Sequence, residues 1–536
     1  MKRRTLLTAT AGVVGLSAGL GSGLFTPAAA ATPKDVLVIA KNIDDMITLD
    51  PAECFEFSGG EIVAQLYTRL VSVDPKDTTK LVGGIAESWT VSDDGGVLTF
   101  KIRPNLKFHS GNPVTAEDAA WSLQRVVILD KTPAFILSQF GWAADNVAEN
   151  IKVTAPDTLQ LTLVNKFAPT LVLNALSAGV GSIVDMKLVM SHAEGDDLGY
   201  GWLKNQSAGS GAFKLLTWKA KDAVALEANP DFYLGAPGMK RVVVRHVGEP
   251  ATQLLLIQKG DADIARNLSP DQIAELTKSP DFKLQTDPKQ SILYLGLNQK
   301  NSILANPKVR EALRYAVDYE GLTNSLLKGQ WMIHQSFLGE GMFGALGNNP
   351  YKLDIEKAKA LLAESGAGSD LSITFDVPNT SPYIDMAQAI QGTFGQAGVK
   401  VELVQADQKQ VLTRYRARNH DMVLMYWSPD YLDPHSTTDY FARNPDNSDE
   451  GKTKTVAWRN AWDIPELTKA TDAAALEPDT AKREQAYLDI QKEVQAQGAY
   501  ILMFQQVEQS VLRSNVQGFV SGPTFDTVNY SGVTKT

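Results

Sequence analysis

The chain has 536 residues, of which 44% are apolar and 21% charged, and this length exceeds what one hydrophobic core usually serves, so we expect at least two lobes. Its formal net charge of −10 repels phosphate backbones and anionic lipid surfaces, and nucleic acid is therefore not an expected partner. The single cysteine, Cys54, excludes an internal disulfide and a cysteine-rich metal cluster, and we expect it to be a small packed residue rather than a nucleophile.

The first 31 residues are typical of a cleavable export signal. Lys2, Arg3 and Arg4 precede an uncharged stretch rich in glycine, alanine and leucine, which ends in small residues that fit a cleavage site. The adjacent arginines predict a twin-arginine signal, with general secretory export and a permanent membrane anchor as alternatives. No cysteine lies near the cleavage site, and no later stretch is apolar over the length of a bilayer. We therefore expect a soluble periplasmic protein without a lipid anchor.

The first part of the mature chain predicts β-rich structure. Residues 36–40 form an apolar strand, residues 61–67 have helical spacing, and residues 90–102 predict a hairpin around an Asp-Gly-Gly turn. Thr115 stands three residues before Asp118, a spacing that predicts the start of a helix.

From about residue 298 to residue 430 the pattern changes to alternating helices and strands. Asn306 and Pro307 open a predicted helix. Its inward-facing residues are Val309, Leu313, Ala316 and Val317, and its water-facing residues are Lys308, Arg310, Glu311 and Arg314. Further predicted helices lie at 354–366 and 383–394, and predicted strands at 371–377, 399–404 and 422–427. This order predicts an α/β fold with a mixed or parallel sheet covered by helices.

No residue set in the sequence carries a recognisable reaction. The six histidines lack the H-x-x-x-H and H-x-H spacings of metal sites, and the chain has no G-x-S-x-G nucleophile elbow, phosphate loop or dinucleotide fingerprint. We therefore expect a protein that is not an enzyme and that has no metal site and no cofactor. A secreted hydrolase is the alternative from a different class.

Several stretches closely resemble the signature regions of the peptide/nickel class of ABC-transporter solute-binding proteins, of the dipeptide- and oligopeptide-binding type. They lie at residues 84–89 (GIAESW), 98–103 (LTFKIR), 107–111 (KFHSG), 209–215 (GSGAFKL), 229–233 (NPDFY), 260–265 (GDADIA) and 427–434 (WSPDYLDP). The resemblance covers essentially the whole mature chain. It implies a two-lobe periplasmic-binding-protein clamshell of class II type with an additional β-rich subdomain.

The resemblance also implies how the chain is divided. Lobe 1 would comprise 32–75, 207–298 and 506–536, the subdomain 76–206, and lobe 2 299–505, after the export signal at 1–31. The chain would then cross between the lobes near Asn298 and residue 505, and the ligand would lie in the cleft between them.

The same resemblance suggests where a ligand binds. Asp430 would receive the ligand's ammonium group, and Phe55, Glu56 and Phe57 would lie against the ligand backbone like an added strand. Trp427, Tyr426 and Tyr431 supply aromatic walls. The competing roles are a turn-capping residue for Asp430 and a core residue for Trp427, and turn capping is the expected role of Asp433.

The implied function is a receptor that captures a small ligand and delivers it to the permease subunits of an ABC importer at the inner membrane. A short peptide is the favoured ligand, while an opine, a sugar, a metal chelate or haem, and a chaperone or signalling role, remain open. We expect a monomer. Arg414, Arg416 and Arg418 are candidates for the ligand's carboxylate, and no spacing rule selects one of them.

Overall fold

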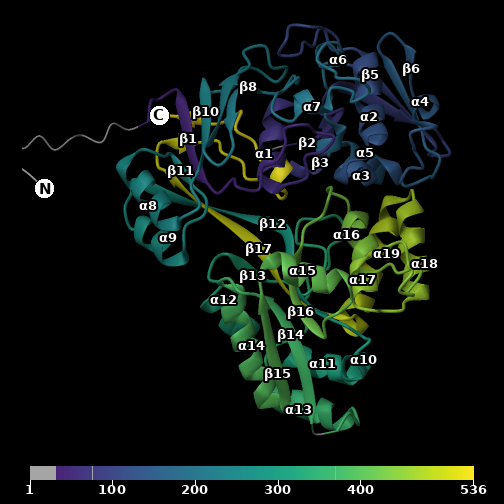
Figure 1. Ribbon diagram of the computed structural model, residues 1–536, viewed down its shortest axis with the longest axis vertical. Coiled ribbons are helices and arrows are strands. Elements are labelled where there is room, and N and C mark those ends of the chain that lie inside the picture. The colour runs from purple at the N-terminus through teal and green to yellow at the C-terminus, as the bar shows by residue number, and fades with distance from the viewer. Residues whose placement is uncertain (1–31, 75–76, 369) are drawn as a thin grey trace, which may run out of the picture.

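A computed structural model describes residues 32–74, 77–368 and 370–536 (Figure 1), so the predicted export signal at 1–31 lies outside the described residues. Two bodies are joined by a pair of long strands, which run from the upper body of Figure 1 into the lower one. Among the described residues, no helix combines the length and the apolar character that crossing a membrane requires.

One large mixed sheet passes through both bodies. Within the described residues it has eleven strands, in the order β15-β14-β16-β12-β17-β11-β1-β10-β9-β8, with β13 paired to β17. The strands are β1 (Val36–Lys41), β8 (Phe213–Lys219), β9 (Ala223–Ala228), β10 (Arg241–His246), β11 (Ile264–Ala265), β12 (Phe282–Leu297), β13 (Trp331–Ile333), β14 (Leu371–Pro378), β15 (Val399–Ala406), β16 (Met422–Trp427) and β17 (Tyr500–Arg513). Parallel pairs at β1–β10, β14–β15 and β14–β16 confirm the predicted mixed α/β sheet.

Groups of buried apolar residues divide the molecule into two lobes and a subdomain. We call the part around Leu37, Phe213 and Val242 the first lobe. It contains α1 (Phe57–Leu66), α6 (Met186–Met190), α7 (Tyr200–Leu203), α8 (Pro250–Lys259), α9 (Pro270–Leu276) and the short pair β18 (Val516–Gln517) and β19 (Thr534–Lys535). The second lobe is built around Phe375 and Tyr294 and contains α10 (Ser302–Ala305), α11 (Pro307–Tyr315), α12 (Tyr319–Asn324), α13 (Ile355–Glu364), α14 (Tyr383–Ala397), α15 (Gln408–Arg416), α16 (Pro434–Phe441), α17 (Val456–Arg459), α18 (Pro465–Leu476) and α19 (Thr480–Gln497).

The subdomain has its own core, which includes Phe100 and Trp142. It contains a four-stranded sheet in the order β4-β5-β7-β6 and the hairpin β2–β3. Its elements are β2 (Val71–Asp74), β3 (Asp77–Gly83), β4 (Ala86–Val91), β5 (Val97–Ile102), β6 (Ile151–Ala155), β7 (Thr158–Thr162), α2 (Ala116–Leu129), α3 (Phe135–Ser138), α4 (Val147–Asn150) and α5 (Pro169–Leu176). The predicted hairpin is β4–β5, and the predicted capping box of Thr115 and Asp118 begins α2.

We propose that the chain is divided largely as predicted, because most residues of each core come from the segments assigned to one lobe or to the subdomain. Some residues pack across the predicted borders. Tyr294 lies in the segment predicted for lobe 1 but packs in a second-lobe core. Leu70 and Val71 pack in the subdomain core, whereas Val184 and Leu203 pack in the first-lobe core.

The two crossings between the lobes are neighbouring strands of one ladder. β12 and β17 pair antiparallel along almost their whole length, and the register is interrupted between Pro288 and Ile292. This interruption precedes the predicted crossing at Asn298, and on β17 it lies opposite Gln505 and Val507. We propose that the lobes bend here, because an irregular ladder resists bending less than a continuous one.

One detail of the predicted helix at Pro307 is wrong. Arg310 and Arg314 do not face water but are only 5% and 2% exposed. Arg314 donates hydrogen bonds to the carbonyl oxygens of Ala496 (3.0 Å) and Gly498 (2.6 Å), where α19 ends. The last carbonyls of a helix have no partners within it, so two planar guanidinium groups satisfy them across the α11–α19 contact and are buried there.

Replacing Arg314 with methionine should therefore destabilise the protein by about 2–4 kcal/mol, since it leaves buried carbonyls unpaired. Lys308→Met is the matched control on the same helix, because Lys308 is exposed and should cost less than about 0.5 kcal/mol. Urea unfolding of both variants measures the difference, and equal midpoints would contradict the capping role of Arg314.

Candidate functional site

A cavity of about 520 Å³ lies where the first lobe, the subdomain and the second lobe meet. Its walls contain Phe55, Glu56 and Phe57 from the first lobe and Trp427 and Asp430 from the second lobe. The structure therefore brings five of the six predicted site residues to one cavity, although they lie far apart in the sequence.

Asp430 lies in the connection between β16 and α16, where Ser436 Oγ accepts a hydrogen bond from its backbone N–H (2.8 Å). Its carboxylate has no hydrogen bond or ion pair with any residue that the structure describes. Burial, with a smaller contribution from the negative charge of Asp439, raises the pKa of Asp430 to about 7. A desolvated carboxylate without a cation is an incomplete ion pair, and it can be completed by a cationic group in the cavity.

The aromatic residues of the motif divide between wall and core. Trp427 lines the cavity and packs on Tyr440, with ring centroids 4.2 Å apart, so it has both of the roles considered for it. Tyr426 also lines the cavity. Tyr431 does not line this cavity; it is buried behind it, and its hydroxyl donates to Gln139 Oε1 at 3.3 Å.

The segment 55–57 is only partly extended. Phe57 is already the first residue of α1, and Glu56 is its N-cap with extended backbone angles. The expected strand-like segment is therefore limited to Phe55 and Glu56. The Glu56 carboxylate accepts the N–H of Phe55 at 3.2 Å, and burial raises the pKa of Glu56.

Of the three arginines considered for the ligand's carboxylate, only one lines the cavity. Arg414 is paired with Asp376, and Arg418 is buried against Asn447 and Asp449. Arg416 lines the cavity and has no ion-pair or hydrogen-bond partner for its guanidinium among the described residues.

A second arginine, Arg459, lines the same cavity. The sequence did not predict a role for it. Arg416 and Arg459 are the last residues of α15 and α17, positions that the helix dipole favours for cations. Burial and the positive charge of Arg459 lower the pKa of Arg416, so the two guanidinium groups lie close enough to repel each other. Arg459 lies outside every recognised motif, and no sequence pattern connects it to Asp430.

Asp433 has the turn-capping role expected from its place before Pro434. Its carboxylate accepts the N–H of His435 at the start of α16 (2.9 Å) and pairs with Arg483 at 2.6 Å. It does not line the cavity that contains Asp430.

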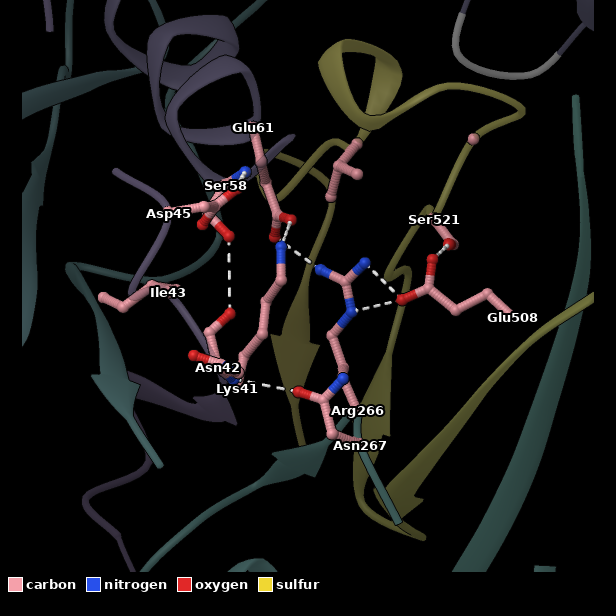
Figure 2. Close-up of polar contacts among 12 residues, drawn as sticks. Lys41, Asn42, Ile43, Asp45, Ser58, Glu61, Arg266, Asn267, Glu508 and Ser521 are labelled. Atoms are coloured by element: carbon pink, nitrogen blue, oxygen red, sulfur yellow. Dashed lines mark hydrogen bonds and ion pairs between the residues drawn. The ribbon is translucent and has the colours of Figure 1, made fainter. Parts of the chain in front are cut away.

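A buried ionic network lies behind the first-lobe wall of the cavity (Figure 2). Lys41 and Arg266 contact the two oxygens of Glu61, and Arg266 also contacts Glu508. Lys289 pairs with Glu508 at 2.8 Å. Burial opposes ionisation of Glu508, but Arg266 and Lys289 outweigh it and hold the pKa of Glu508 below its usual value.

The network connects the crossing strands to the cavity wall. Lys289 belongs to β12 and Glu508 to β17, so their ion pair lies at the interrupted part of the ladder. The ammonium groups of Lys41 and Lys289 lie 6.0 and 5.5 Å from the ring centre of Phe525, which stacks on Phe57 at 4.0 Å. Both rings line the cavity, so the network supports this wall from behind.

The sequence and the fold are similar to those of known proteins. The family model for bacterial extracellular solute-binding proteins, family 5 middle, matches residues 80–449. The probable D,D-dipeptide-binding periplasmic protein DdpA of Escherichia coli is 31% identical over 511 residues, which cover 94% of this chain and 95% of that protein. The di/tripeptide-binding protein 2 of Pseudomonas aeruginosa is 25% identical over 485 residues, covering 85% of this chain and 87% of the relative. The solved structure of HbpA2 from Haemophilus parasuis has a TM-score of 0.79 at 23% identity, covering 94% of this chain and all of that one, and shows the same fold.

Glu508→Gln tests the ionic network. The change leaves Arg266 and Lys289 buried with less negative charge, so the free energy of unfolding should fall by about 3–5 kcal/mol. Glu275→Gln, at an exposed acid of the first lobe, should change it by less than about 0.5 kcal/mol. Denaturant unfolding at neutral pH compares the two variants; a Glu508→Gln protein as stable as the control would show that the network is not stabilising.

Asp430→Asn tests whether Asp430 is a desolvated carboxylate that awaits a ligand's cation or a residue that stabilises a turn. Because the pKa of Asp430 is higher in the folded state, its contribution to stability falls as pH rises from about 4 to about 7. Without ligand, the variant should be more stable than the wild type at pH 7.5, by on the order of 2 kcal/mol, and this difference should vanish towards pH 4. Thermal melts across this range measure it. A variant that melts below the wild type at both pH values would identify Asp430 as a turn residue.

Proposed function

The chain belongs to the bacterial extracellular solute-binding proteins of family 5, and from this premise we propose that it binds a short peptide by both of its charged ends. Members of this family are receptors of ABC importers and not enzymes, so the cavity between the lobes is a binding site. The peptide proposal rests on one observation: charged groups of both signs, Asp430 and the pair Arg416 and Arg459, line the cavity, and none of the three has an ion-pair partner among the described residues.

Asp430 is proposed to receive the ligand's ammonium group. An ammonium group near a desolvated carboxylate forms a charge-assisted hydrogen bond and removes the cost of keeping Asp430 ionised and unpaired. The walls around it, Trp427 and Tyr440, are aromatic and can also contact a cation through their ring faces.

Arg416 and Arg459 are proposed to receive the ligand's carboxylate. Two guanidinium groups that repel each other in the free protein are drawn together by a shared anion, and each presents planar donors that match carboxylate geometry. These residues come from helices separate from the segment of Asp430, so the site has distinct receptors for the two ends of a zwitterion.

The charged groups of the cavity favour a peptide over a neutral sugar, one of the ligand classes left open by the sequence. A neutral sugar can hydrogen-bond to Asp430 and to the arginines through its hydroxyl groups, but it carries no charge that would balance theirs. The named relatives, by their own descriptions, bind D,D-dipeptides or di- and tripeptides, which carry both charged ends. A peptide therefore accounts for more of the cavity's charged groups than a sugar does.

The receptor role implies a location and partners. We infer that the protein is exported to the periplasm without a lipid anchor, acts as a monomer, and presents its loaded form to the permease subunits of its importer. Closure of the lobes over the peptide would occur at the interrupted ladder of β12 and β17.

Blocking each end of the peptide separately tests the proposal. In calorimetry with L- and D-alanine di- and tripeptides, N-acetylation of the tightest ligand should weaken binding to the wild type by roughly a hundredfold, since the loss of a buried charge pair costs about 3 kcal/mol. Asp430→Asn should bind the free peptide about as weakly as the wild type binds the acetylated one, and acetylation should then have little further effect. C-terminal amidation should likewise weaken binding to the wild type. It should have little further effect on the affinity of Arg459→Gln.

Asp463→Asn, at an exposed acid outside the cavity, is the control for a general change of charge and should bind like the wild type. Wild-type affinity that is indifferent to both modifications would show that the ligand is not held by its ends. Absence of binding by every peptide of the panel would overturn the peptide proposal itself.

A further inference from the structure

A second cavity lies behind Asp430. Its volume is about 290 Å³, and it shares Phe135, Asp430 and Tyr440 with the cavity described above. We call it the rear cavity. Because Asp430 lines both spaces, a ligand whose ammonium group lies at Asp430 would have its first residue close to the rear cavity.

The rear cavity is acidic. Asp439 lines it together with Asp430, and no lysine or arginine is among its described lining residues. Asp439 is weakly paired, since Arg443 Nε lies 3.6 Å from it and only 2.6 Å from Asp472. The second carboxylate is therefore largely available to a cation that enters the cavity.

The ring of a buried histidine in the same wall lacks a hydrogen-bond partner among the described residues. His435 is only 6% exposed, and neither ring nitrogen has a hydrogen-bond partner among the residues that the structure describes. Burial lowers the pKa of His435, so its imidazole is neutral and retains one acceptor nitrogen. An orphaned acceptor beside two carboxylates suits a group that is rich in N–H donors.

The remaining walls suit the same kind of group. Phe135, Tyr431 and Tyr440 line the rear cavity, and aromatic faces attract cations while packing on aliphatic stems. Asp430, Asp439 and His435 do not form a metal site, because no group of three or more acidic, histidine or cysteine side chains among the described residues is arranged to hold a metal ion. An extended organic cation reaches such separated groups better than a single ion does.

We propose that the rear cavity receives a positively charged side chain on the amino-terminal residue of the ligand, so that the protein prefers peptides that begin with lysine, arginine or a similar basic residue. This inference rests on the proposed function, because it takes the peptide's ammonium group to lie at Asp430. It adds a specificity-determining role for Asp439, with His435 as an acceptor for the side chain's N–H groups.

The test compares matched tripeptides by calorimetry on the purified protein: Lys-Ala-Ala, norleucine-Ala-Ala and Ala-Lys-Ala. Norleucine keeps the four side-chain carbons of lysine but lacks its ammonium group, and the third peptide moves the charge to the second position. The wild type should bind Lys-Ala-Ala about tenfold or more tightly than either of the others. In Asp439→Asn the advantage over norleucine-Ala-Ala should fall to about twofold or less, while Asp463→Asn should keep it.

Equal affinities of the wild type for Lys-Ala-Ala and norleucine-Ala-Ala would overturn the inference, and so would an Asp439→Asn protein that keeps the full advantage. The first comparison needs no variant, so a folding defect in Asp439→Asn cannot hide a negative result. If norleucine-Ala-Ala binds well and without discrimination, the receptor proposal stands and only the rear-cavity assignment fails. If no peptide binds, the proposed function fails first.

Discussion

The ion pair between Lys289 and Glu508 is the contact on which the two-lobe arrangement depends, because it joins the two strands that cross between the lobes where their ladder is interrupted. Glu508 is shared with Arg266, and Arg266 is shared with Glu61, so the pair continues into the first lobe as one buried network. Three cations with two carboxylates in a dry environment are expensive to separate, since each broken contact leaves a charge without compensation. The network therefore fixes the first-lobe end of the two crossing strands relative to α1 and to the cavity wall at Phe525.

The charged groups of the ligand cavity, unlike those of the network, are not paired with one another. The network satisfies its charges internally, whereas Asp430, Arg416 and Arg459 lack such compensation among the described residues and are held apart on separate elements. The desolvated carboxylate of Asp430 reduces the stability of the free protein, and a cationic ligand group that pairs with it returns that free energy on binding. A rigid, satisfied scaffold beside an unsatisfied cavity is thus a physical basis for selective binding.

Much of the fold could be predicted from the sequence because it is encoded in local patterns. Alternation in β14 and β5 and the capping box at Thr115 each depend on residues a few positions apart. Where the prediction failed, the partner was distant: Arg314 is charged and was assigned to water, but it caps carbonyls of α19 more than 180 residues away. Arg459 was missed for the same reason, since only the folded chain brings α17 to the cavity. Asp430 was found because a family motif marks it, and its missing partner is a property of the structure alone.

The pairing of the two crossings has a mechanical consequence. Two separate linkers would let the lobes swing and twist independently, but β12 and β17 share one ladder and must deform together. The paired strands are therefore expected to act as one hinge, in which a single angle describes the motion of the lobes. In the proposed closure, occupancy of the cavity sets this one angle, so a protein that touches both lobes from outside would sense whether a ligand is bound without contacting the ligand itself.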